Sequence, residues 1–112
     1  MKSLLEQNKE FIIFLNKLSK SERNRLLGVL GTKYINTISE IFYNFLKQNL
    51  TSDTSVIKRV KLYKNEVRAI ARKRLPIYKK RVLLQSKKGG SILSVLLPIA
   101  SSLITSLFSR RG

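Results

Sequence analysis

The sequence predicts an all-α protein with a small head of about three helices, a long basic amphipathic helix, a short basic helix and an apolar C-terminal helix. Apolar residues recur every three or four positions along most of the 112 residues, as expected for helices that bury one face. Turn-forming residues separate these periodic stretches. The length is enough for one small domain at most, so the helices are expected to share a small core.

Residues 1–50 form the predicted helical head. Apolar side chains at helical spacing predict a first helix over residues 3–18. Ser19 and Glu22 then match a capping box, in which Ser19 is the N-cap of a second, short helix. Gly31 is a suitable C-terminal stop for that helix.

A third helix follows in the head, because residues 34–46 carry a broad apolar stripe over more than three turns. We expect this helix to end near Asn49. Its aromatic residues are interpreted as core packing rather than as a ligand site. Residues 50–54 form a polar turn that offers three caps for the next helix: Ser52, Asp53 and Thr54.

The basic segment, residues 51–88, is predicted to contain two helices. The longer one covers residues 55–74 and has one apolar seam at alternating steps of four and three. Pro76 disfavours helix at the residue before it but suits the first turn of a new helix. We therefore expect a second, shorter helix over residues 76–86. The seam consists of Val56, Val60, Tyr63, Val67 and Ile70.

Residues 89–112 read as a flexible Gly-Gly hinge followed by an apolar tail. The 18 residues 91–108 carry no charge, which is the lower edge of membrane-spanning length. Three interpretations stay open: the tail spans a membrane, lies at its surface, or is buried in a partner or a self-assembled bundle. The expected contact residues are Ile92, Leu93, Leu96, Leu97, Ile99, Leu103, Ile104, Leu107 and Phe108.

Lysine and arginine outnumber acidic residues 23 to 6, which gives the chain a net charge of +17 and a pI near 10.8. Residues 58–88 carry 13 basic side chains and a single acidic one, Glu66, whereas residues 1–57 carry 8 and 5. Solubility alone requires a net charge of only about 2–8 in a small domain. We therefore expect a polyanionic partner: DNA, RNA or anionic lipid.

Phosphate neutralisation is the mechanism that the basic segment suggests, because each cation set against a phosphate releases a condensed counterion. No residue pattern indicates base reading, so binding is expected to tolerate any sequence. Tyr63 and Tyr78 are candidates for stacking on bases, although Tyr63 also fits the apolar seam. The candidate nucleic-acid-binding residues are Lys58, Arg59, Lys61, Lys64, Arg68, Arg72, Lys73, Arg74, Lys79, Lys80, Arg81, Lys87 and Lys88.

Catalysis finds no support in the sequence. The chain has no cysteine and no histidine, which removes thiol nucleophiles, disulfides and the usual proton shuttle. Its six carboxylates are scattered, and neither a phosphate-binding glycine loop nor metal-ligand spacing is present. We therefore expect a protein that is not an enzyme and that uses no metal or cofactor.

The end of the chain resembles adenovirus core protein X, the mu precursor, and more closely the X-like proteins of adintoviruses and Polinton/Maverick elements. The likeness lies in a Lys/Arg-rich stretch at 79–85, Lys-Lys-Gly-Gly at 87–90 and Leu-Leu-Pro-Ile-Ala at 96–100. With adenovirus X itself it covers about the last third of the chain. The family commonly has Phe after Gly-Gly, where this chain has Ser91. The viral protease prefers an aliphatic residue where this chain has Lys87.

This resemblance implies a small virion core protein that condenses double-stranded DNA and acts in the virion and the host nucleus. The expected partners are double-stranded DNA or RNA, a capsid protein or an anionic membrane through the tail, and further copies of the chain. One alternative is a membrane-active minor capsid-type protein whose tail inserts into anionic membranes. Another is a helical module that binds a host factor.

Overall fold

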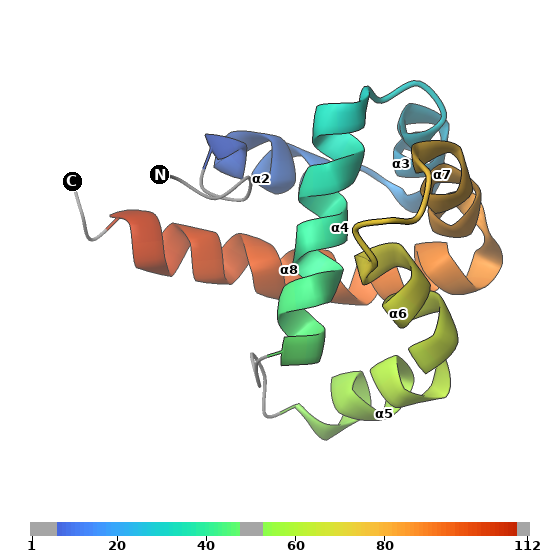
Figure 1. Ribbon diagram of the computed structural model, residues 1–112. Helices are drawn as coiled ribbons and strands as arrows, with labels where there is room; N and C mark the ends of the chain where they lie inside the picture. Colours follow the sequence, from blue (N-terminus) through green and yellow to red (C-terminus); the bar gives the residue numbers. More distant parts are fainter. Residues whose placement is uncertain (1–6, 48–52, 110–112) are drawn as a thin grey trace.

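A computed structural model describes residues 7–47 and 53–109, with side chains up to Ile104. These residues form seven helices and no strand (Figure 1), which confirms the predicted all-α class. The helices are α2 (Lys9–Lys17), α3 (Lys20–Leu27), α4 (Thr32–Lys47), α5 (Thr54–Leu62), α6 (Lys64–Ala71), α7 (Ile77–Gln85) and α8 (Lys87–Ser109).

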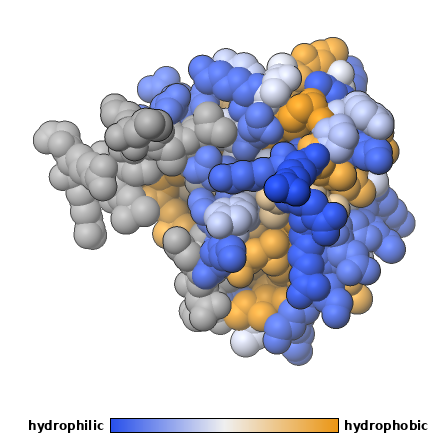
Figure 2. Space-filling view, viewed as in Figure 1, coloured by the Kyte–Doolittle hydropathy of each residue, from blue (hydrophilic) through white to orange (hydrophobic). Residues whose placement is uncertain are grey.

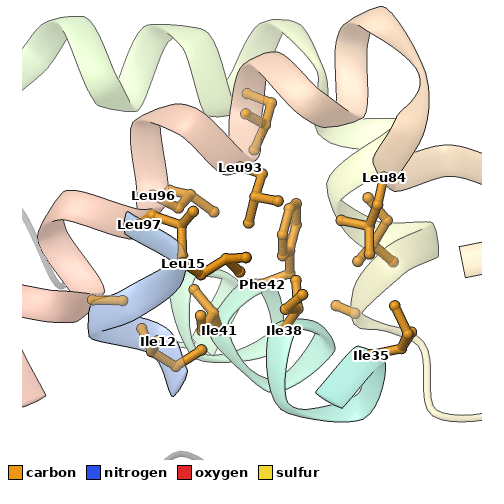
Figure 3. Close-up of a cluster of buried hydrophobic side chains, with 14 of the residues drawn as sticks. Ile12, Leu15, Ile35, Ile38, Ile41, Phe42, Leu84, Leu93, Leu96 and Leu97 are labelled. Carbon is orange, nitrogen blue, oxygen red and sulfur yellow. The ribbon is translucent and has the colours of Figure 1, made fainter. Parts of the chain in front are cut away.

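The hydrophobic core is formed by α4 packed mainly on α6 and by α8 packed mainly on α2 and α7, and α3 adds Leu27. Figure 3 shows side chains from these elements converging, among them Leu15, Phe42 and Leu93. All three are fully buried, and each such side chain contributes roughly 1.5–3 kcal/mol by leaving water. The head, the basic segment and the tail therefore share one core rather than dividing into separate units.

The apolar tail is part of this core. Helix α8 runs across the molecule behind α4 in Figure 1 and packs mainly against α2 and α7. Ile92, Leu93, Leu96 and Leu97 have no exposed surface, and Ile104 is only 5% exposed. In this fold the other helices of the same chain cover these residues, and their expected contact with a membrane or a partner stays a prediction.

The glycine pair does not form a hinge, because Gly89 and Gly90 lie in the first turns of α8. Ser86 has extended backbone geometry and caps this helix, since its side chain accepts a hydrogen bond from the Gly89 amide at 3.1 Å. A Cβ placed on Gly89 would lie 1.8 Å from the carbonyl oxygen of Leu83. Glycine therefore permits α8 to start directly against the end of α7.

The predicted long basic helix is two helices. Helix α5 ends at Leu62 and α6 starts at Lys64, with non-helical backbone angles at Tyr63 between them. The apolar seam does face the core, but Val67 is fully buried whereas α5 has no buried residue. The turn lets α6 pack closely on α4 while α5 remains at the edge. Helix α6 also ends earlier than predicted, at Ala71.

The head follows its sequence signals more closely. The capping box is confirmed, because the Glu22 amide donates to Ser19 Oγ and the Ser19 amide donates to the Glu22 carboxylate. Helix α3 ends at Leu27 with Gly28 as its C-cap, earlier than the predicted stop at Gly31. Asp53 caps α5 through the Ser55 amide. The predicted end near Asn49 and residues 3–6 of the first helix lie outside the described residues.

Arg23 joins three helices although it has little contact with solvent. It is 8% exposed, and its guanidinium donates to the backbone oxygens of Leu15 and Leu18 at the end of α2. A third hydrogen bond, 2.8 Å long, reaches Ser94 Oγ on α8. A cation at the C-terminal end of a helix also interacts favourably with the helix dipole. This arginine therefore fixes α2 and α3 against α8.

We predict that Gly89→Ala and Gly90→Ala change stability in opposite directions. Alanine in a helix is normally better than glycine by about 1 kcal/mol, and at Gly90 its Cβ makes only an ordinary contact of 3.4 Å. At Gly89 the new Cβ meets backbone, which we expect to destabilise the protein by about 1–3 kcal/mol. Urea unfolding of both variants tests this. Equal effects would contradict the tight α7–α8 junction.

Candidate nucleic-acid interface

The thirteen predicted binding cations are spread over α5, α6, the connection from 72 to 76, α7 and the start of α8. Figure 2 shows hydrophilic side chains along the edge of the molecule where α6, α7 and the start of α8 lie in Figure 1. Eleven of the thirteen are exposed, and we call them the cationic surface: Lys58, Arg59, Lys61, Lys64, Arg68, Arg72, Lys73, Arg74, Lys79, Lys87 and Lys88.

Few negative charges offset this surface. Glu66 is the only acidic residue between 58 and 88. Its Oε1 lies 3.8 Å from Lys88 Nζ, and the Lys88 side chain is still 63% exposed. No other cation of the surface forms an ion pair within the described part of the chain. Ten of the eleven cations are therefore available to an external anion.

Lys80 and Arg81, two predicted binding residues, are held inside the fold. Lys80 is 1% exposed and Arg81 is half-buried. Arg81 Nη1 donates to the backbone oxygen of Leu27 at 2.7 Å and so satisfies the end of α3. Both residues were predicted from charge alone. Lys80, however, lies three positions after Ile77 and four before Leu84, on the helix face that turns inward.

The buried Lys80 takes part in a polar relay between helices, which supplies one acceptor for its ammonium group. Its Nζ donates to Ser39 Oγ at 2.9 Å, and Ser39 Oγ donates to the Ile70 backbone oxygen at 2.5 Å. The relay thus connects α7 to α4 and α6. Burial lowers the pKa of Lys80 because it disfavours the charged ammonium. The sequence signal that could have revealed the relay is Ser39, which lies among the isoleucines of the α4 stripe.

The two tyrosines of the basic segment lie in different environments. Tyr63 is half-buried and packs against the core, as its position on the seam suggested. Tyr78 is 65% exposed on α7 and lies next to Lys79 in the sequence. An exposed aromatic ring among cations is the arrangement that stacks on nucleic-acid bases. Of the two, Tyr78 is the one available for such contact.

The head also presents cations that charge density in the sequence did not single out. These head cations are exposed, but the acidic residues Glu10, Glu22 and Glu40 lie on the same helices. The net charge of the head is therefore closer to zero than that of the basic segment. Lys33 and Lys47 lie over the rings of Tyr34 and Tyr43, both at 5.8 Å from the ring centre. The other exposed head cations are Lys9, Lys17, Lys20 and Arg25.

Four of the predicted tail contact residues remain to be placed. Ile99 and Leu103 are half-buried, and the side chains of Leu107 and Phe108 lie outside the described residues. Among the helices described here, none combines the length and the hydropathy that crossing a membrane requires.

In comparisons with known proteins, no family model, no curated sequence and no solved structure matches this chain.

We predict a pH-dependent contribution of Lys80 to stability. Its pKa in the folded state lies below the ordinary value of 10.5, so between the two values the unfolded chain binds more protons than the folded one. The free energy of unfolding, relative to that of Lys80→Met, should therefore rise with pH and level off above 10.5. Urea unfolding at several pH values measures this difference. A difference independent of pH would show that Lys80 is solvated.

Proposed function

We propose that this protein binds nucleic acid, double-stranded DNA first, by placing the cationic surface of α5–α8 against the phosphate backbone. The observation that carries the proposal is the exposure of eleven cations with a single ion pair among them. An ordinary soluble surface mixes both signs of charge. A polyanion supplies the missing negative charges and releases its own counterions on binding.

The short helices of the basic segment favour contact with the backbone over base reading. Helix α5 is nine residues long and α6 is eight, and their exposed residues include five cations: Lys58, Arg59, Lys61, Lys64 and Arg68. Phosphate contacts position a protein on DNA without conveying sequence information. We therefore propose binding that tolerates any duplex sequence, with Tyr78 available to stack where strands are open.

The resemblance to X-like core proteins suggests a setting for this activity. In that setting the protein condenses a double-stranded DNA genome inside a virion and acts in the host nucleus. Condensation requires neutralised phosphates, and the cationic surface supplies that charge. In this fold, the Gly-Gly pair that contributes to the resemblance has a packing role at the α7–α8 junction.

Matched charge variants test the proposed interface. The triple variant Lys61→Gln, Lys64→Gln and Arg68→Gln removes three exposed cations from α5 and α6, and the control removes three exposed head cations, Lys9, Lys17 and Lys33. Both variants change the net charge equally. Fluorescence anisotropy with short duplexes of two different sequences, over about 50 to 200 mM salt, measures affinity and its salt dependence.

We expect the wild-type affinity to fall about 10³–10⁵-fold over this salt range if roughly 6–10 phosphates are contacted. The α5–α6 variant should lose about 0.9 from the slope of log affinity against log salt for each contact removed. The head variant should keep the wild-type slope. A flat salt response of the wild type, or equal loss of slope in the two variants, would contradict the proposed interface.

A further inference from the structure

An open cavity of about 510 Å³ lies where α4 meets the end of α6 and the start of α7. The residues that line the cavity differ in how far they are buried. Ser39 and Lys80 are buried and form the floor, Glu40 is half-buried, and Tyr43 and Lys73 are exposed at the rim. The cavity therefore leads from solvent towards a buried ammonium group. Its volume lies within the range of about 300–1,000 Å³ that is usual for small-molecule sites.

The ammonium of Lys80 has fewer partners than it can use. A lysine ammonium carries three N–H donors, and Ser39 Oγ accepts one of them. That hydroxyl donates its own hydrogen bond to the Ile70 backbone oxygen, so it is a neutral acceptor for Lys80. No carboxylate of the described residues lies within ion-pair distance of Lys80, although Glu40 lines the same cavity.

A buried cation without a counterion is unfavourable, because its lost hydration is not offset by an opposite charge. Lysine side chains as buried as Lys80 are rare unless they are paired with an opposite charge. The cavity provides the space for such a pairing, and Lys73 at its rim adds a second positive charge. An anionic group that entered from solvent would meet both lysines.

We propose that this cavity is a binding site for a small molecule with one oxyanion group, a phosphate or a carboxylate, that pairs with Lys80. Asn36 and Asn44 on the walls would hydrogen-bond the polar body of the ligand, and Tyr43 would cover it at the rim. Glu40 repels a second anionic group and accepts hydrogen bonds, so the rest of the ligand is neutral or cationic.

This site shares Lys73 with the cationic surface, but it centres on the buried Lys80 and does not depend on the proposed DNA binding. Lys80 is 1% exposed, so the phosphates of a stiff duplex cannot approach it as closely as a small ion can. The two sites share the same chemistry, the recognition of an oxyanion. An experiment must therefore separate free phosphate from duplex DNA as the source of that group.

NMR of the full chain with ¹⁵N-labelled lysine side chains makes this separation. The probe is inorganic phosphate, exchanged for chloride at constant ionic strength. We expect a saturable shift of the Lys80 Nζ signal, whereas exposed Lys79, its neighbour on α7, should show only a weak, non-saturating drift. Duplex DNA should shift the Lys79 signal and leave the Lys80 signal in place.

Thermal unfolding of Lys80→Met and of the matched control Lys79→Met gives a second measurement. Phosphate should raise the unfolding temperature of the wild type and of Lys79→Met, and the part of the rise that saturates should disappear in Lys80→Met. If Lys80→Met does not fold, the NMR titration of the wild type decides. The proposal is overturned if phosphate leaves the Lys80 signal unmoved, if Lys80→Met responds as the wild type does, or if only DNA moves that signal.

Discussion

The structure depends on covering the apolar face of α8. Residues 91–108 carry no charge, and a helix of that composition is unstable in water unless its apolar side chains are buried. In this fold α2, α4, α6 and α7 provide the cover. The first turn of α8 approaches α7 so closely that only glycine fits at position 89. Arg23 adds a polar attachment through Ser94.

Because the apolar tail occupies the interior of the fold, the basic residues between 58 and 88 lie mostly at the surface. Their charges cannot be buried without large desolvation costs, so eleven of the thirteen basic residues between 58 and 88 lie at the surface. Lys80 and Arg81 are the exceptions because α7 turns that face inward, and each has a hydrogen-bond acceptor there. A helical core and a surface with unbalanced positive charge are therefore two consequences of one packing arrangement.

Local signals in the sequence were sufficient for the all-α class and for the start of α3, but not for the break at Tyr63, the start of α8 or the packing partners of the helices. Helical periodicity gave the all-α class, and the capping box at Ser19 fixed the start of α3. Hydropathy showed that the tail must be buried, yet it carries no information on whether the cover comes from the same chain. The Gly-Gly pair suggested a flexible hinge because composition does not show that the Leu83 carbonyl packs against Gly89. The break at Tyr63 depends on docking against α4, which a one-dimensional pattern omits.

Amide hydrogen exchange along α8 and the basic segment, with and without duplex DNA, tests the account most directly. If α8 is the core, its amides between residues 92 and 100 exchange slowly, near the rate set by global unfolding, in both states. Added DNA should slow exchange in α5, α6 and the other segments of the cationic surface, but not between residues 92 and 100. Fast exchange in α8 of the free protein, or protection by DNA that appears in α8 and not in α5 and α6, would contradict it.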